Sequence, residues 1–456
     1  MLTDFSKGKY RAENGYALAS VLILVTVLSA VCAIILRVQM RERQTLLESI
    51  DDAKSRSASE NGVVLSLASI QSKPSSDSTF SISFEDGSSA NVAIYPWGLF
   101  TGVRSQGVSH NIRSIRSALL ASSLTDSEGV ALVLGNLQHG LVFTGRAKII
   151  GDVAVGPMGV STGNLRNYSA PQSVPIKGKR TTSFTQQSFS DTLALFHHVF
   201  LSRTLLNRIR RYPVNQDESG HVLECQGSPS LHEVNDSIVY VYCSGSLNLT
   251  DTIMRRGPPL YIVAQGPVSF RPNVFLSGPI SICSIDSIVV PPSVSLTNCT
   301  LTSEKSIVFQ SVGSVQLFSP VIHLSSNAVA SYPSAVVSVS FADSSGTIQS
   351  IELDNGSRVE GAVVMHRTNT TSMSNAVVVL SPGATVVGGV YTDAYLTLDG
   401  TVRGYVRAFD LYFYDSPTTY LGWMRQGIID RSSLPNGFLK PFIDSGSDTL
   451  KVLTWM

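Results

Sequence analysis

Four cysteines are the side chains with the clearest covalent chemistry in this sequence: Cys225, Cys243, Cys283 and Cys299. An even set of cysteines can form disulfide bonds, and four of them allow three pairings. Pairing between sequence neighbours, Cys225 with Cys243 and Cys283 with Cys299, is one prediction. The other is that these thiols are small hydrophobic side chains buried in strands.

No motif for phosphoryl-transfer or metal-dependent catalysis occurs in the sequence. It contains no GxxxxGK[ST] or HExxH, and no CxxC or His-Cys cluster with metal-ligand spacing. Glycoside hydrolysis would need two carboxylates on either side of the scissile bond. The acidic residues are scattered, and the pairs that could lie on adjacent turns are Asp354 with Glu360 and Asp393 with Asp399. We therefore predict a non-enzymatic protein without cofactor or metal.

The composition is that of an exported, β-rich protein. Charged residues make up only 15% of the chain, which has 35 Gly and a net charge of +1. A chain so close to neutrality has no bulk electrostatic attraction to nucleic acid. Because 43% of the residues are hydrophobic, the chain can bury a large core and is not disordered.

One segment, residues 16–36, is uncharged, mostly apolar and long enough to span a bilayer core as a helix. A polar leader precedes it, with Lys7, Lys9 and Arg11, and this leader ends at Gly15. A secretory signal peptide would carry its small-residue cleavage site after the apolar region rather than before it. The sequence therefore predicts a membrane-inserted helix with an inverted leader.

This inverted order resembles the class III leader of type IV prepilins and pseudopilins. The resemblance implies that a prepilin peptidase cuts on the cytoplasmic side after Gly15, so that the mature chain begins at Tyr16. Two positions depart from the family: its first mature residue is usually Met or Phe, and its fifth, here Ser20, is usually Glu. In the family that glutamate is thought to pair with the terminal amine of a neighbouring subunit. Its loss implies a minor or initiating subunit, and the alternative is an ordinary signal anchor.

The apolar segment passes without Gly or Pro into a charged stretch that reaches Asn61, so we expect one helix over residues 16–72. Leu46, Leu47, Ile50, Ala53 and Ala58 recur there at helical spacing and form an apolar stripe. Such an apolar stripe must pack on another surface. The resemblance implies that a globular head covers it, whereas a linker helix above a membrane anchor would have the same periodicity.

Residues 73–150 are predicted to form a pilin-like α+β region. A hairpin is expected over residues 80–95, a helix over 112–124, and strands near 130–136 and 141–151. A separate helix is expected over 190–212, where apolar residues follow helical spacing after the cap Ser190-Asp191 and Pro213 ends the pattern.

From residue 151 to 415 the sequence predicts a β-solenoid that contains the 190–212 helix as an insertion. Short β-branched strands recur at regular intervals, a pattern typical of a β-helix or a β-sandwich. The segment with Gly400, Val402, Gly404 and Val406 resembles bactofilin-type parallel β-helices, in which G-x-V-x-G-x-V recurs at the corners. We expect a right-handed parallel β-helix, with a β-sandwich as the alternative. A capping segment is expected over residues 416–456.

The fold class predicted is therefore α+β, with a long N-terminal helix followed by a mainly β domain. The resemblance implies a minor pilin or pseudopilin of a type IV pilus or type II secretion-like filament. Its partners would be other pilin-like subunits, prepilin peptidase and the bacterial inner membrane, with the C-terminal domain in the periplasm or outside the cell. The alternative is a membrane-anchored surface adhesin or glycan-binding protein.

Overall fold

The computed structural model describes residues 9–70, 78–123, 129–136, 138–182, 222–225, 240–255, 257–340, 348–367, 375–441 and 450–455. The helix predicted over 190–212 lies outside these ranges. The chain divides into two compact units, with Met1–Leu65, Thr79–Val92 and Arg104–Arg116 in unit 1 and the remaining residues in unit 2. The division falls within one helix and four strands, and each unit is described by itself below.

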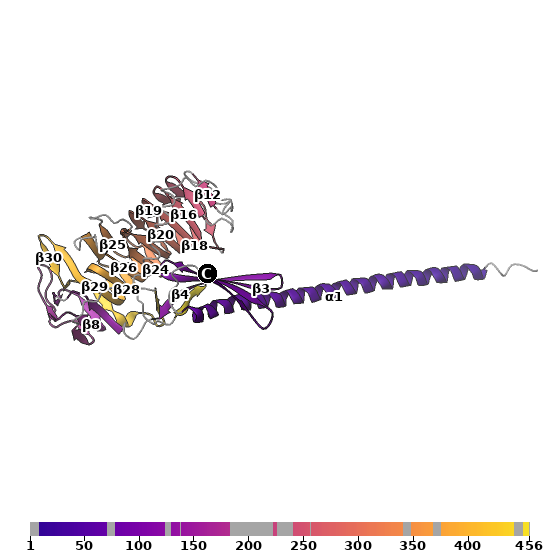
Figure 1. Cartoon of the computed structure of the whole chain (residues 1–456), viewed down its shortest axis with the longest axis horizontal. Helices are drawn as coiled ribbons and strands as arrows, with labels where there is room; N and C mark the ends of the chain where they lie inside the picture. The colour runs from indigo at the N-terminus through magenta and orange to yellow at the C-terminus, as the bar shows by residue number, and fades with distance from the viewer. Residues whose placement is uncertain are drawn as a thin grey trace, which may run out of the picture. The chain divides into compact units, whose positions relative to one another are not determined.

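The main element of unit 1 is α1 (Lys9–Ser69), a single unbroken helix of 61 residues (Figure 1). The predicted continuation of the apolar helix into the charged stretch is therefore confirmed. Neither part contains proline, and the glycines Gly15 and Gly62 are accommodated within the helix. A single glycine weakens a helix by only about 1 kcal/mol, which neighbouring turns and packing can offset.

Four strands follow: β1 (Ser78–Ser83), β2 (Ser89–Trp97), β3 (Phe100–Ser109) and β4 (Ile112–Ser123), which lie side by side in that order. Two-residue connections join β2 to β3 and β3 to β4, and connections this short can join only antiparallel strands. The hairpin predicted over 80–95 is confirmed.

The helix predicted over 112–124 is wrong, because Ile112–Ser123 is the strand β4. Its first half alternates between partly buried and exposed side chains, and its second half, Ser117–Ser122, is buried on both faces. A continuous apolar run of this kind fits a buried helix or a buried strand equally well. The strand is selected by pairing with β33 (Leu439–Lys440) and β34 (Leu450–Trp455), which come from the end of the chain.

Most of unit 2 is a parallel β-solenoid whose coils stack through three ladders of strands (Figure 1). The first ladder contains β12 (Val222–Cys225), β13 (Tyr240–Cys243), β16 (Leu260–Ala264), the later parts of β18 (Phe275–Ser284), β20 (Ser295–Ser303), β22 (Val312–Ser319), β24 (Val329–Ser338) and β26 (Arg358–Met365), the middle parts of β28 (Thr385–Leu398) and β29 (Thr401–Asp415), and then β5 (Val130–Leu134), β8 (Asp152–Val155) and β11 (Arg180–Thr182).

The second ladder contains β14 (Leu247–Leu249), β17 (Val268–Phe270), β19 (Ser287–Val290), β21 (Ser306–Phe309), β23 (Val321–Leu324), β25 (Gln349–Leu353), β27 (Ala376–Leu380) and the ends of β28 and β29. The third contains β15 (Ile253–Met254), the first parts of the long strands from β18 to β29, β32 (Ile428–Asp430), β7 (Lys148–Ile150) and β10 (Ile176–Lys177). A smaller parallel sheet joins β31 (Trp423–Met424), β6 (Leu141–Phe143) and β9 (Val160–Thr162).

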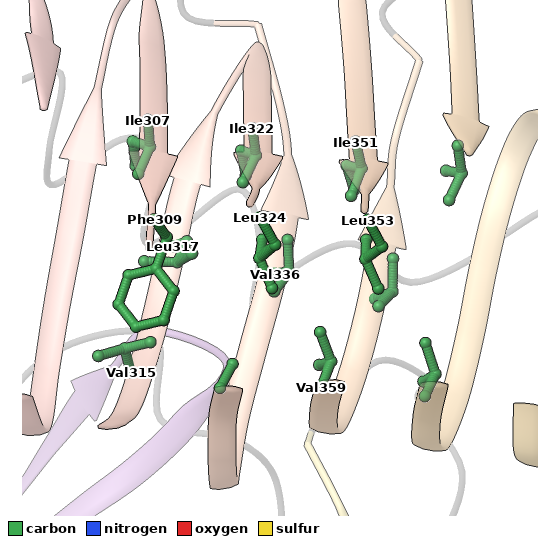
Figure 2. Packing of buried hydrophobic residues seen from close by; sticks show 14 of the residues in the cluster. Ile307, Phe309, Val315, Leu317, Ile322, Leu324, Val336, Ile351, Leu353 and Val359 are labelled. Carbon is green, nitrogen blue, oxygen red and sulfur yellow. The ribbon is translucent and has the colours of Figure 1, made fainter. Parts of the chain in front are cut away.

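The parallel pairing confirms a solenoid and excludes the β-sandwich alternative. Side chains of one kind stack from coil to coil inside it, as Figure 2 shows for Ile307, Ile322 and Ile351, which are register partners and are fully buried. Phe309, Leu324 and other branched side chains continue the core. Removing this apolar area from water is the main stabilising term, at about 25 cal/mol per Å².

Coil order in space differs from coil order in the sequence. The strands of residues 130–182 pair with β29 and β32, so the first coils of the chain extend the stack beyond the last ones. Parallel pairing therefore begins at Val130 rather than at residue 151, and it ends at Asp430 rather than at 415. No local pattern signals this arrangement, because it depends on strands far apart in the chain.

The end of the chain contributes to three sheets instead of forming one cap. β30 (Thr418–Leu421) folds back on β29 as an antiparallel hairpin, and β31 and β32 enter the coils. A short 3-10 helix, η4 (Arg431–Ser433), follows, and β33 and β34 then pair with β4.

Aromatic and aliphatic side chains cover part of the outer surface of the first ladder. Leu99 and Phe438 pack there with Phe318, Tyr391 and other buried residues. Two bonds fix this covering layer, because the Gln316 Nε2 donates to the Trp97 carbonyl at 2.9 Å and the Leu99 N–H donates to the Gln316 Oε1 at 2.8 Å.

Candidate functional site

The N-terminal part of α1 is an apolar surface. Within the described ranges, one helix is long and apolar enough to cross a membrane; it has a mean hydropathy of 2.8 in its most apolar window, and none of that window is buried. Leu22 and Leu28 are 65% and 61% exposed. So much contiguous exposed apolar surface is unfavourable in water and marks a membrane or protein contact.

The predicted processing positions lie in this same part of α1. Gly15 lies within the helix, and the Tyr16 side chain is 83% exposed. The Ser20 hydroxyl donates to the Tyr16 carbonyl at 2.6 Å, so its hydrogen-bonding need is met within the helix. A serine at this position is therefore uncharged and hydrogen-bonded within its own helix, whereas a glutamate would need a partner in the membrane.

The C-terminal part of α1 carries a buried face of small side chains in unit 1. Ser55, Ala58, Ser59 and Val63 are buried there. The helix backbone approaches β3 so closely that a Cβ at Gly107 would overlap the Ser55 carbonyl. Of the stripe predicted from the sequence, Ala58 is buried, whereas Leu46, Leu47 and Ile50 are exposed, because the packed segment begins later in the helix and uses small residues.

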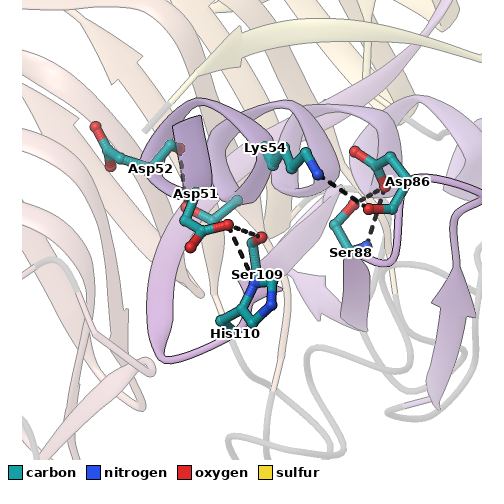
Figure 3. A network of polar contacts seen from close by, with 8 residues as sticks. Asp51, Asp52, Lys54, Asp86, Ser88, Ser109 and His110 are labelled. Carbon is teal, nitrogen blue, oxygen red and sulfur yellow. Dashed lines mark hydrogen bonds and ion pairs between the residues drawn. The ribbon is translucent and has the colours of Figure 1, made fainter. Parts of the chain in front are cut away.

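Polar contacts add to this packing (Figure 3). The Asp51 carboxylate accepts a hydrogen bond from the Ser109 hydroxyl at 2.9 Å and lies 3.1 Å from the His110 Nδ1. The Lys54 ammonium donates to the Asp86 carbonyl at 3.2 Å. Hydrogen bonds from the hydroxyl and then the N–H of Ser88 lower the pKa of the Asp86 carboxyl. Asp51, His110 and Ser109 are not a nucleophilic triad, because the serine bonds to the carboxylate rather than to the imidazole.

The predicted pairing of Cys283 with Cys299 is wrong, since both are free, buried thiols. Cys283 packs with Tyr242 and Val263, whereas Cys299 belongs to the solenoid interior, so the two side chains lie on opposite faces of one sheet. Burial raises the pKa of the Cys299 thiol to about 12. Cys243 is disulfide-bonded, and its register partner in the next strand is Cys225.

The four carboxylates considered as pairs from the sequence each have a basic partner. Asp354 lies 2.9 Å from the His323 Nε2, and Glu360 pairs with Arg358 at 2.7 Å. The Asp399 carboxylate accepts from the Arg425 Nε at 3.1 Å, and Asp393 lies 2.9 Å from the His366 Nδ1. The contacts of these four carboxylates are thus with basic side chains and not with the other carboxylate of the pair considered from the sequence. Among the described residues no group of three His, Cys, Asp or Glu side chains could hold a metal ion.

One cluster was not found from the sequence. Asp410 is 1% exposed, and its Oδ2 accepts from the Asn136 Nδ2 at 2.7 Å and lies 3.1 Å from the His139 Nδ1. Burial raises the pKa of the Asp410 carboxyl, and hydrogen bonds from Asn136 and the Leu411 N–H oppose this shift. Tyr395 is the register partner of Asp410 on the preceding coil. More than 270 residues separate Asn136 from Asp410, so no sequence motif could have revealed this cluster.

Comparisons with known proteins identify no family. No protein-family model matches the sequence, and no curated protein matches it. Among solved structures, the chain is similar to the ice-binding protein LeIBP from an Arctic yeast, with 14% identity, 55% of this chain and 94% of that chain covered, and a TM-score of 0.19. It is also similar to the competence-associated pilin ComZ from Thermus thermophilus, with 10% identity, 89% and 97% covered, and a TM-score of 0.18.

A third similar structure is an ice-binding protein from an Antarctic Flavobacteriaceae bacterium, with 11% identity, 63% of this chain and 95% of that chain covered, and a TM-score of 0.15. Likenesses at these identities and TM-scores carry no conclusion about activity or partners. The fold class rests on the chain's own elements. They are a long apolar helix and, after it, a large β domain whose strands pair in parallel.

Proposed function

We propose that this protein is a pilin-like structural subunit, a minor pilin or pseudopilin of a type IV pilus or type II secretion-like filament. A prepilin peptidase would cut after Gly15 and leave the apolar helix as the N-terminus. The helix would hold the subunit in the bacterial inner membrane before assembly, and it would then pack among the helices of other pilin-like subunits. The β-rich part would lie outside that membrane.

The observation that carries the proposal is the division of α1 into two parts with different surroundings. Its N-terminal part is apolar and exposed, and its C-terminal part packs on strands of unit 1 through Ser55, Ser59 and Val63. A helix that only anchored a domain would not need to continue unbroken from the apolar segment into a packed face. The uncharged Ser20 supports a low-copy subunit, because it brings no carboxylate to pair with a neighbour's terminal amine.

The test is the mature N-terminus of the full chain, produced in a bacterium that has a prepilin peptidase and a type IV filament system. Mass spectrometry is expected to show a chain that begins at Tyr16 and to detect it in sheared filaments. Gly15→Leu should leave the leader attached and remove the protein from the filaments. Ser20→Ala is the matched control: it changes a neighbouring position but should be cut normally.

An uncut wild-type chain that is found in membranes but never in filaments would exclude the assembly role. The protein would then be an anchored ectodomain. A chain that is cut after Gly15 but absent from filaments would also contradict the subunit role, because processing alone does not make a filament component.

A further inference from the structure

A patch on the outer surface of the solenoid combines aromatic rings with fixed polar groups. We call it the Asp410 patch and define it by Asn136, His139, Tyr395, Asp410 and Tyr412, all of which belong to unit 2. Three segments meet in it, namely β28, β29 and the residues after β5. The Asn136 N–H donates to the Phe409 carbonyl at 2.7 Å, which fixes the last of these segments against β29.

The polar groups of the patch are held in place before any ligand binds. One oxygen of Asp410 accepts from the Asn136 amide, and the other accepts from the Leu411 N–H at 2.8 Å. His139 lies beside the same carboxylate at 3.1 Å, and 37% of its side chain is exposed. The buried carboxylate and amide therefore orient the half-exposed imidazole at the surface.

The aromatic part lies directly beside this carboxylate. Tyr395 stacks on Tyr412 with ring centroids 5.2 Å apart and an interplanar angle of 24°, and both side chains are partly exposed. The charge of Asp410 and the neighbouring Tyr412 contribute, after burial, to the raised pKa of the Tyr395 hydroxyl, and Arg367 opposes them. Arg367 is held in turn by its N–H, which donates to the Asp393 carboxylate at 2.6 Å.

We propose that the Asp410 patch binds a hydroxyl-rich ligand, namely a pyranose unit of a glycan chain. A pyranose has an apolar C–H surface that packs on aromatic rings and a rim of hydroxyls that both donate and accept hydrogen bonds. The patch offers two partly exposed rings together with the half-exposed His139 imidazole, which the buried Asp410 carboxylate and Asn136 amide hold in place. The negative charge of the Asp410 carboxylate disfavours a phosphate or another anion at the same place.

This inference is independent of filament assembly, because the patch lies in the solenoid and involves no residue of α1. Its test uses the full chain in detergent. Cellohexaose, maltohexaose and chitohexaose are titrated by calorimetry at neutral pH. We expect at least one of the three to bind, and Tyr412→Ala to weaken that binding by about tenfold or more, equivalent to about 1.4 kcal/mol.

Tyr414→Ala is the matched control, because Tyr414 lies on the same strand, is 57% exposed and is outside the patch. It should change the affinity less than about twofold. His139→Gln keeps a hydrogen-bonding side chain and should weaken binding without changing the thermal unfolding temperature. This variant keeps the test decisive if Tyr412→Ala fails to fold.

No binding of any of the three oligosaccharides at about 10 mM would overturn the proposal, since that limit corresponds to a free energy weaker than about −3 kcal/mol. Equal losses in Tyr412→Ala and Tyr414→Ala would also overturn it, because the bound sugar would then lie elsewhere. Neither result bears on the mature N-terminus or on filament incorporation.

Discussion

The solenoid core and the helix packing of unit 1 are stabilised in different ways. The solenoid buries stacked branched side chains such as Ile307, Ile322 and Ile351. The packed face of α1 buries serine and alanine and is supplemented by polar contacts at Asp51 and Lys54. Apolar burial scales with area and is not screened by salt, whereas exposed ion pairs contribute little and are screened. We infer that α1 is the more easily displaced element.

The largest effect is expected at a glycine where two coils approach each other closely. Gly388 has a φ of 136°, and a Cβ there would overlap the Gly361 carbonyl of the preceding coil. Gly388→Ala should therefore destabilise the solenoid by at least about 3 kcal/mol or prevent its folding, measured by denaturant unfolding. Gly245→Ala is the control, because a Cβ there meets nothing within 4 Å. Equal effects of the two substitutions would contradict the close-approach argument.

A cavity in the stacked core should have the next largest effect. Leu317 is fully buried between Leu301 and Val336, its register partners (Figure 2). Leu317→Ala should cost about 2 to 5 kcal/mol of unfolding free energy, because it removes apolar contacts and leaves a void that neighbouring coils fill only in part. Val308→Ala, at an outward and only partly buried position of the core strand β21, should cost much less.

Comparable losses at Leu317 and Val308 would mean that the interior stack does not dominate the stability of the solenoid. Hydrogen exchange adds a second criterion. Leu317→Ala should accelerate exchange in the coils around it and leave the exchange of α1 unchanged if the two regions are stabilised separately.

The sequence predicts those features of the two regions that depend on local pattern. The apolar run of residues 16–36 and the absence of proline give the helix, and alternation over 80–95 gives the first hairpin. Glycines such as Gly404 indicate the solenoid corners, and Gly404 does have a φ of 152°. These features need only neighbouring residues, so they are visible without a structure.

Features that depend on distant pairing could not be predicted. The apolar residues of β4 look helical until β33 and β34 pair with that strand. Coil register decides that Cys283 and Cys299 face opposite sides of a sheet. It also brings His139 to Asp410 across 271 residues. Each case depends on which strands pair in space, and sequence periodicity does not contain that information.

In the helix packing, removing one polar contact should have a smaller, local effect. Asp51→Ala removes the acceptor for the Ser109 hydroxyl and the neighbour of His110. We expect a loss of about 1 to 2 kcal/mol, visible as faster amide exchange over residues 51–65 with no change in the solenoid. Asp52→Ala is the control, because the Asp52 carboxylate pairs with Arg56 of the same helix rather than with a strand. Faster exchange in both variants would show that loss of helical charge, rather than the contact, is responsible.

The smallest effects are expected from the exposed ion pairs. One pair lies within α1, and the other joins α1 to a strand of the same unit. Arg56 and Asp52 lie 2.7 Å apart on one helix face, and Arg116 of β4 lies 3.2 Å from Glu60. Arg56→Gln should cost about 0.2 to 0.5 kcal/mol and Arg116→Gln less than about 1 kcal/mol. Both losses should shrink at about 1 M salt, where the Debye length is about 3 Å. A loss at Arg116 that exceeds the loss at Leu317, or that persists in salt, would reverse the comparison and make the polar contacts of α1 its main support.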